Sequence, residues 1–205
     1  MKITWFGHSC FMLESEHGTL VFDPWEKDYV PGYKHIPDNL TANEVICSHD
    51  HNDHNASQLI EISEKKHSYD IIKIPAFHDE ENGSLRGNNT ITLVKFDNLK
   101  IVHFGDIGCP LTNEQKEMLM DSDIVMIPVG GYYTIDAKTA YEMTKSINAK
   151  VVIPMHYRGN NFGFDVISDV ESFTSLTDNT RYLSSNTVTI NKEDIIPSTI
   201  VFKPL

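Results

Sequence analysis

The sequence is poor in cysteine and contains no long apolar run, and each shortage excludes a class of protein. Its three cysteines, Cys10, Cys47 and Cys109, are odd in number and far apart. We therefore expect no disulfide framework, and we expect the protein to reside in a reducing compartment. No stretch resembles a membrane span, and the N-terminal residues, which include His8 and Glu14, lack the basic region and cleavage site of a signal peptide. We expect a cytoplasmic protein with no membrane partner.

Positive charge is also scarce. The chain has 17 Lys and Arg residues against 29 Asp and Glu, which gives a formal net charge of -12. Surfaces that bind nucleic acid normally carry a basic patch, so no nucleic-acid partner is expected. The 205 residues, of which 40% are hydrophobic, suffice for one substantial core and not comfortably for two. We predict a single domain over residues 1–205, and a homo-oligomer is left open.

Apolar stretches separated by turn residues predict many strands and a few helices. In the first half we expect strands over residues 2–6, 10–14, 19–22, 44–47 and 71–75, a loop over 25–43, and a helix over about 55–65 capped by Asn55. In the second half we expect a hairpin of residues 90–96 and 99–104 turned at Asp97–Asn98, strands over 124–129 and 151–154, and helices capped by Thr112 and Asp136. The apolar residues between Val166 and Phe173 predict one more helix, and two short strands are expected at the end of the chain.

The two halves of the chain resemble each other weakly. Each contains a hairpin that ends near an acid, Asp23 or Asp106, and later an apolar strand that ends near a histidine, His49 or His156. This pattern predicts an α+β fold in which two β-sheets lie face to face with helices outside. Polar residues at the strand ends would then converge at one edge of the sandwich.

The run from Ser48 to His54 is the strongest chemical signal, because it holds three imidazoles and two carboxylates within seven residues. His49 and His51 alternate, so their side chains leave the backbone on the same side and can bind one metal ion. Asp53 and His54 follow too closely to serve that ion and are placed to hold a second one. A solvated polar loop is the competing interpretation, which suits isolated histidines better than this dense run.

Three further ligand candidates, His78, Asp106 and His156, each follow an apolar strand that can aim the side chain. Taken singly, each has an ordinary structural interpretation. Taken together, they predict two divalent ions, the first held by His49, His51 and His78 and the second by Asp53, His54 and His156, with Asp106 bridging them. Imidazoles with a few carboxylates suit zinc first, and also manganese or iron.

Two adjacent cations lower the pKa of a bridging water and polarise a carbonyl or phosphoryl oxygen. The predicted function is therefore metal-dependent hydrolysis, in which a bridging hydroxide attacks an ester, lactone, amide or phosphodiester of a small molecule. Asp23 and Asp79 are candidates to fix the histidine tautomers.

The series His49-x-His51-x-Asp53-His54, followed by His78, Asp106 and His156, resembles the metallo-β-lactamase superfamily of metal-dependent hydrolases. The resemblance covers nearly the whole chain. It implies an αββα sandwich of two mixed β-sheets, a dinuclear site at its edge and the ligand roles given above.

Shorter motifs resemble a small, uncharacterised prokaryotic branch of that superfamily, loosely similar to the ascorbate-6-phosphate lactonases. They include Gly7-His8-Ser9, Arg86-Gly87-x-Asn89-Thr90-Ile91 and Pro154-Met155-His156-Tyr157. In that branch a histidine often stands where this chain has Cys109, so no role is carried over to Cys109.

His8 and Arg86 are the remaining catalytic candidates beside Asp53. His8 either points into the cleft or satisfies backbone groups. Arg86 either binds a phosphate or carboxylate of an anionic substrate or pins a loop. Asn89 is expected to hydrogen-bond a loop and His103 to pack in the core, while Tyr132 and Tyr133 either wall the pocket or cover the core.

Two other functions remain open at this point. The first is an iron-dependent oxidoreductase or dioxygenase on the same fold. A flavodiiron enzyme normally has a flavin-binding domain attached, and we expect none here because the sequence ends at Leu205. The second is a metal-stabilised interaction module without catalysis. Metal content and visible absorbance distinguish an iron oxidoreductase from a hydrolase.

Overall fold

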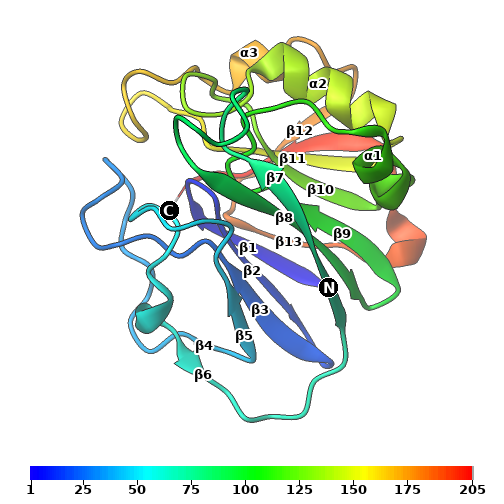
Figure 1. Cartoon of the computed structure of the whole chain (residues 1–205). Coiled ribbons are helices and arrows are strands. Elements are labelled where there is room, and N and C mark those ends of the chain that lie inside the picture. The colour runs from blue at the N-terminus through cyan, green and yellow to red at the C-terminus, as the bar shows by residue number, and fades with distance from the viewer. Residues whose placement is uncertain (205) are drawn as a thin grey trace.

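The computed structural model describes residues 1–204, which form two mixed β-sheets packed face to face (Figure 1). The first sheet consists, in spatial order, of β13 (Thr187–Thr189), β1 (Lys2–Gly7), β2 (Cys10–Ser15), β3 (Gly18–Phe22) and β5 (Glu44–Ile46). The second consists of β12 (Thr180–Tyr182), β14 (Ser198–Val201), β11 (Val151–Met155), β10 (Ile124–Pro128), β9 (Leu99–His103), β8 (Asn88–Phe96) and β7 (Asp70–Phe77). The two short strands β4 (Thr41–Ala42) and β6 (Glu61–Ile62) pair separately.

The predicted hairpins are present. β1, β2 and β3 are antiparallel neighbours, and β3 then pairs in parallel with β5. β8 and β9 are joined at Asp97 and Asn98, whose φ angles of 52° and 60° match a turn that follows the twist of the strands. The loop predicted over residues 25–43 is irregular apart from β4 at its end.

Residues 1–204 form three α-helices, and all of them lie over the seven-stranded sheet (Figure 1). They are α1 (Asn113–Leu119), α2 (Ala137–Ser146) and α3 (Glu171–Thr174). Thr112 and Gln115 form the predicted capping box on α1, and the Asp136 carboxylate accepts a hydrogen bond from Thr139 N at the start of α2. Because helices cover the outer face of this sheet, the central strands β10 and β11 are buried throughout.

The prediction of a helix over residues 55–65 is wrong. A single 3₁₀ turn, Ser57–Leu59, is followed by β6. The amides of Glu61 and Ser63 donate to the carbonyls of Leu40 and Ala42, at 2.9 and 2.7 Å, so the chain is extended to pair with β4. Asn55 caps no helix, because its side-chain amide donates to Asp50 instead. Pairing with a distant segment has overridden the local helical pattern.

Two predictions near the C-terminus also need correction. The helix expected between Val166 and Phe173 begins only at Glu171, because the amide of Ser168 donates to Gly130 O at 2.7 Å and its carbonyl accepts from Arg158 N. The end of the chain contributes three short strands, β12, β13 and β14, instead of two, and a 3₁₀ turn at Lys192–Asp194. The boundary predicted at residue 205 lies outside the described residues.

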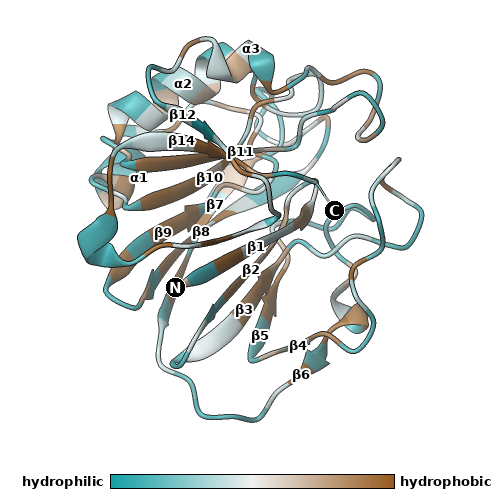
Figure 2. Ribbon diagram, turned by 180° about the vertical axis from the view of Figure 1, so that it is seen from behind, coloured by the Kyte–Doolittle hydropathy of each residue, from teal (hydrophilic) through white to brown (hydrophobic). Residues whose placement is uncertain are grey.

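The hydrophobic core fills the space between the sheets and extends under the helices. Hydrophobic residues follow the strands of both sheets, whereas hydrophilic residues predominate on the outer helices and loops (Figure 2). Trp5, Phe11, Phe22 and Phe104 are among the large side chains that are fully buried. Within residues 1–204, none of the helices combines the length and the apolar character needed to cross a membrane.

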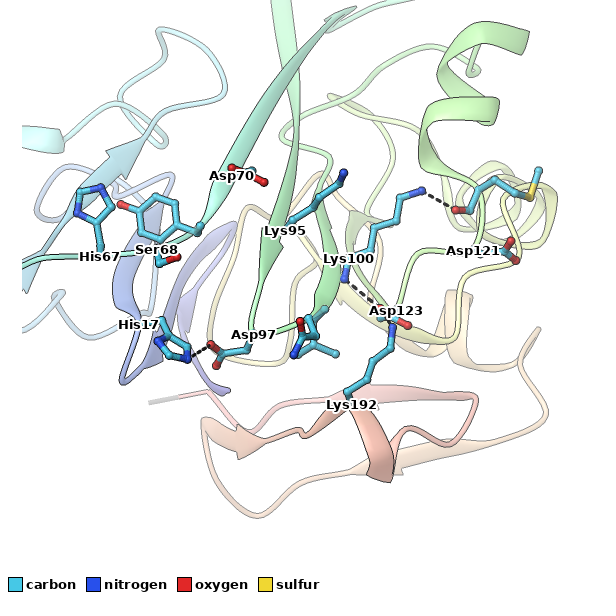
Figure 3. A pocket seen from close by; sticks show the side chains of 14 residues that line it. His17, His67, Ser68, Asp70, Lys95, Asp97, Lys100, Asp121, Asp123 and Lys192 are labelled. Carbon is cyan, nitrogen blue, oxygen red and sulfur yellow. Dashed lines mark hydrogen bonds and ion pairs between the residues drawn. The ribbon is translucent and has the colours of Figure 1, made fainter.

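Asp123, which directly precedes β10, is a buried carboxylate that forms hydrogen bonds with three lysine residues. It lines an open cavity of about 870 Å³ near the Asp97–Asn98 turn, and Figure 3 shows it beside Lys100 and Lys192. Its oxygens accept hydrogen bonds from Lys100 N and Lys150 Nζ, both at 2.9 Å, and from Lys192 Nζ. Burial alone would raise the pKa of Asp123, but the bonds from the two ammonium groups hold it below its usual range.

Asp123→Asn is therefore expected to destabilise the protein by about 2 kcal/mol at pH 7, because charged hydrogen bonds at a buried site are lost. A lowered pKa in the folded state means that the stabilisation is complete above the unfolded pKa of about 4 and is lost as the pH falls through the folded value. Urea unfolding of chelator-treated proteins at pH 7 and pH 3 measures both effects. Asp38→Asn, at an exposed position, is the control. The account would be contradicted if the wild type and Asp123→Asn had the same free energy of unfolding at pH 7. It would also be contradicted if the gap between them were larger at pH 3 than at pH 7.

Candidate metal centre

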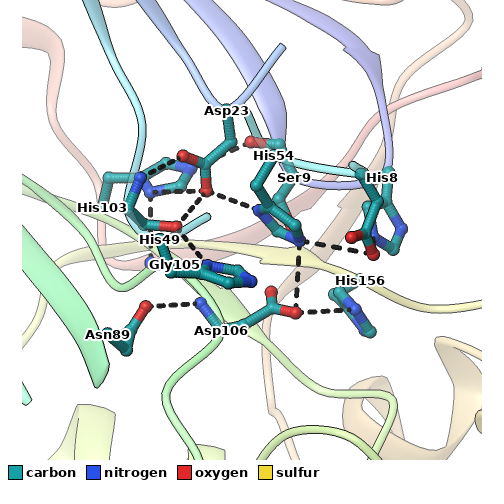
Figure 4. A network of polar contacts seen from close by, with 12 residues as sticks. His8, Ser9, Asp23, His49, His54, Asn89, His103, Gly105, Asp106 and His156 are labelled. Carbon is teal, nitrogen blue, oxygen red and sulfur yellow. Dashed lines mark hydrogen bonds and ion pairs between the residues drawn. The ribbon is translucent and has the colours of Figure 1, made fainter. Parts of the chain in front are cut away.

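Polar residues that follow the C-terminal ends of strands meet at one edge of the sandwich (Figure 4). The strands concerned are β1, β3, β5, β7, β9 and β11, and the residues after them include, in the same order, His8, Asp23, His49, His78, Asp106 and His156. Parallel neighbours deliver their ends to the same edge. Residues far apart in sequence are thereby brought into contact.

Asp106 lies at the centre of this cluster. Its Oδ2 is 3.0 Å from His156 Nε2, 3.2 Å from His54 Nε2 and 3.5 Å from His78 Nε2. Asn89 fixes its backbone, because Asn89 Oδ1 accepts from Asp106 N at 3.0 Å. Gly105, with a φ of 55°, passes so close to Asn89 and Ser48 that a Cβ there would lie 2.3 Å from Asn89 Oδ1. The position of Asp106 thus depends on a glycine before it.

The three residues assigned to the first ion lie together. His49, His51 and His78 offer nitrogen atoms that all lie within 4.8 Å of one another. Ser48 Oγ lies 2.9 Å from His49 Nδ1, which leaves His49 Nε2 facing the cluster without a hydrogen-bond partner. His51 is the exposed member of the set and lies at the mouth of the site.

The residues assigned to the second ion lie together as well, and His8 joins them. Asp53, His54, His156 and His8 offer ligand atoms within 4.8 Å of one another. His8 Nε2 is 3.2 Å from Asp53 Oδ2, and the ring of His8 lies 4.1 Å from that of His156. His8 is fully buried with a positive φ of 53°, and its carbonyl accepts from Trp5 Nε1 at 3.0 Å. The backbone around His8 therefore holds its ring inside the cluster.

Asp23 orients the histidine run, as the sequence suggested. Its Oδ2 lies 2.8 Å from His54 Nδ1, and its two oxygens accept from Ser48 N and Ser48 Oγ, each at 2.7 Å. A histidine whose outer nitrogen is held in this way presents a defined tautomer and ring orientation to a metal. His54 Nε2 consequently points at Asp106.

Asp79 has a different role from the one expected. Instead of contacting a histidine ring, its buried carboxylate accepts hydrogen bonds from four backbone amides, those of Glu81, Gly83, Leu85 and Arg86. These bonds hold the pKa of Asp79 below its usual range against the effect of burial. Asp79 organises the loop after β7, so its nearness to His78 in the sequence was misleading.

Burial and contacts between the side chains shift the pKa values of the histidines and of Asp106 in different directions. Burial lowers the pKa of His8 to about 4 and that of His49 to about 3. Burial would also lower the pKa of His54, but the charges of Asp106 and Asp23 raise it well above its usual value. The pKa of Asp106 would rise on burial, but His156 and His54 hold it well below its usual range. His8 and His49 are therefore held as neutral imidazoles and Asp106 as an ionised carboxylate, the states that bind metals, whereas His54 would have to release a proton to bind a metal ion.

The donor set fits divalent metal ions. His49 Nε2 and Asp106 Oδ1 are buried without a hydrogen-bond partner among the described residues, and these two residues form with His54 a group whose ligand atoms lie within 4.8 Å. Buried polar atoms normally have partners, because leaving them unpaired costs free energy. A cation coordinated by these atoms removes that cost. Mixed imidazole and carboxylate donors match zinc, manganese or iron.

The other candidates fall into two groups. His103 packs in the core as expected, stacked on Phe22 at 4.9 Å, with Nε2 bonded to Ser9 O. Asn89 is a hydrogen-bonding residue, but it belongs to β8 and not to a loop. Tyr133 and Arg86 line the cavity beside His51, His78 and His156, whereas Tyr132 is mostly exposed.

Some residues of the site were missed from the sequence. A cavity of about 400 Å³ opens over His51, Asp53, Asp106 and His156, and its walls include Tyr29 and Phe164. Both aromatics belong to irregular segments, where no periodic pattern marks a buried face. Ser48 was noted only as the first residue of the histidine run, although its hydroxyl links Asp23 to His49.

Two facing mixed sheets with a histidine and aspartate cluster at the strand ends define a protein of the metallo-β-lactamase fold. Residues 2–156 match the family described as the beta-lactamase superfamily domain, and the chain belongs to that family.

Several relatives cover nearly the same length. A UPF0173 metal-dependent hydrolase from Thermoplasma acidophilum is 30% identical, and the match covers 86% of this chain and 90% of that protein. One from Archaeoglobus fulgidus is 27% identical, covering 84% and 89%. Among solved structures, a Thermotoga maritima protein described as a Zn-dependent hydrolase of the metallo-β-lactamase superfamily is 32% identical, with a TM-score of 0.78 over 98% of both chains. YhfI of Bacillus subtilis, at 12% identity and a TM-score of 0.60 over 99% and 96%, shares the fold.

Proposed function

We propose that this protein is a metal-dependent hydrolase with two divalent metal ions, which opens an ester, lactone, amide or phosphodiester bond of a small molecule. The observation that carries the proposal is the position of Asp106, whose carboxylate faces histidines of both donor groups at 3.0 to 3.5 Å. The description of the relatives as metal-dependent hydrolases supports the same reaction class. The cations would lower the pKa of a water molecule and polarise a carbonyl or phosphoryl oxygen of the substrate.

The candidate ligands form two groups, one for each proposed ion. His49, His51 and His78 would hold one ion, while Asp53, His54 and His156 would hold the other. Asp106 would contact both. Zinc is the first candidate metal, and manganese and iron suit the same donors.

Other residues keep these ligands in place. Asp23 orients His54 directly and supports His49 through Ser48. His8 fixes the carboxylate of Asp53 through the contact between Nε2 and Oδ2 at 3.2 Å. Since a ligand that is already oriented loses less freedom when the ion binds, these contacts favour tight binding.

We further propose that residues 1–205 act as one domain in the cytoplasm and do not bind nucleic acid. The three cysteines are free, which supports a reducing compartment. The net charge of -12 opposes binding to a polyphosphate backbone.

The test is elemental analysis of protein purified without added metal, followed by a screen of generic ester, lactone and phosphodiester substrates before and after chelation. We expect about two equivalents of metal per chain and hydrolysis that stops when the metal is removed. An iron protein with visible absorption bands that consumes oxygen and hydrolyses none of the probes would favour the oxidoreductase and contradict the proposal.

A further inference from the structure

The cavity over the metal ligands has an aromatic wall. The ring of Phe164 lies 6.4 Å from that of Tyr29 and 6.1 Å from that of Tyr133, and the ring of Tyr133 lies 6.5 Å from that of His156. All three aromatic residues line the cavity of about 400 Å³. An apolar part of a substrate can therefore pack beside the ligands.

Arg86 is the one Lys or Arg side chain that lines this cavity within residues 1–204. Its Nη2 donates to Tyr132 O at 3.1 Å, and its Cζ lies 5.9 Å from the centre of the Tyr133 ring. The Asp79 carboxylate fixes the backbone of Arg86 by accepting from its amide at 2.7 Å. The guanidinium is thus held beside the aromatic wall by contacts on both its main chain and its side chain.

No carboxylate of the described chain neutralises Arg86. The acids Asp79, Glu80, Glu81 and Asp136 line a neighbouring cavity that shares Arg86 with the first, yet none of them forms an ion pair with its guanidinium. The guanidinium of Arg86 is thus oriented by a carbonyl and an aromatic ring without a carboxylate partner within residues 1–204. Its remaining N–H groups are available to a ligand, and their fork geometry matches a carboxylate or a phosphate.

We propose that the substrate is an anion whose carboxylate or phosphate group binds Arg86, while an apolar part packs against Tyr133 and Phe164 and the bond to be cleaved lies over the metal ligands. This inference rests on the proposed hydrolase function for the position of the cleaved bond. The binding of the anion by Arg86 can be measured without turnover. Arg86 is thus a specificity-determining residue for negatively charged substrates.

The experiment compares the wild type with Arg86→Gln and Arg86→Lys, all loaded with zinc. Three probes are titrated by calorimetry: benzoate, phenyl phosphate and the neutral benzyl alcohol. A lost bidentate contact to a charged group costs about 1.5–3 kcal/mol, so Arg86→Gln is expected to weaken binding of an anionic probe by roughly 10- to 150-fold. Arg86→Lys, which keeps the charge but not the fork, is expected to recover part of that loss. Binding of benzyl alcohol is expected to stay the same.

Arg181→Gln, on the exposed strand β12, is the matched control and is expected to change nothing. A loss confined to benzoate identifies a carboxylate substrate, a loss confined to phenyl phosphate identifies a phosphate, and a loss of both supports the shared anion chemistry. Equal binding of both anions by the wild type and Arg86→Gln would overturn the proposal. If these binding differences are found but none of the ester, lactone and phosphodiester probes is hydrolysed, the hydrolase proposal fails and the anion site stands.

Discussion

His51→Ala is expected to lose metal and activity together while keeping the fold. His51 is exposed at the mouth of the site and contributes to the group formed with His49 and His78. Its removal would leave the ion proposed at His49 and His78 with one imidazole fewer, and it creates no buried cavity. Mutation of an outer partner of a metal ligand already costs 10- to 100-fold in affinity or activity, so loss of a ligand itself is expected to lower turnover by at least about 100-fold.

The measurement combines elemental analysis with activity on any ester or phosphodiester that the wild type hydrolyses. Bound metal is expected to fall from about two equivalents towards one, and the urea midpoint of the metal-free protein is expected to stay unchanged. His67→Ala removes a second exposed histidine, which is stacked on Tyr69 away from the cluster, and serves as the control. A His51→Ala protein with two equivalents of metal and full turnover would show that the ligand assignment is wrong.

The sequence predicted most of the fold because the strands are marked locally. Apolar stretches end at turn residues such as Asp97 and Asn98, and the continuous apolar strand β10 signals burial on both faces. The predicted α+β sandwich of mixed sheets is confirmed. The segment over residues 55–65 was predicted wrongly because its structure depends on Leu40 and Ala42, which a local pattern cannot include.

The cluster was visible in the sequence for a related reason. Four of the seven predicted ligands lie between His49 and His54, and the other three follow strands that the apolar pattern marks. Which contacts each residue makes was harder to predict. His8 was left with two interpretations, and only the fold shows that β1 delivers its ring to Asp53. Asp79 lies next to His78 in sequence yet serves a loop, since hydrogen bonds to backbone amides leave no compositional signal.

Removal of metal is expected to cost the protein much of its thermal stability. Buried donors such as His49 Nε2 and Asp106 Oδ1 have no hydrogen-bond partner within residues 1–204, so the folded cluster favours a cation, whereas the unfolded chain does not bring these residues together. A ligand present at about 1,000 times its Kd stabilises the folded state by about 4 kcal/mol. For a chain of this size that corresponds to a melting temperature higher by roughly 8–16 °C.

Calorimetry or circular dichroism of the zinc-loaded and chelator-treated proteins measures this shift. Zinc added back to the treated protein is expected to restore the higher melting temperature, and calcium is not, because imidazole donors suit zinc while calcium takes oxygen ligands. The same chelation is expected to shift His51→Ala less, since that variant retains a complete donor set only around Asp53, His54 and His156. A melting temperature that is the same with and without metal would mean that the cluster is stable through its own hydrogen bonds and ion pairs, and the two-ion assignment would then lose its physical basis.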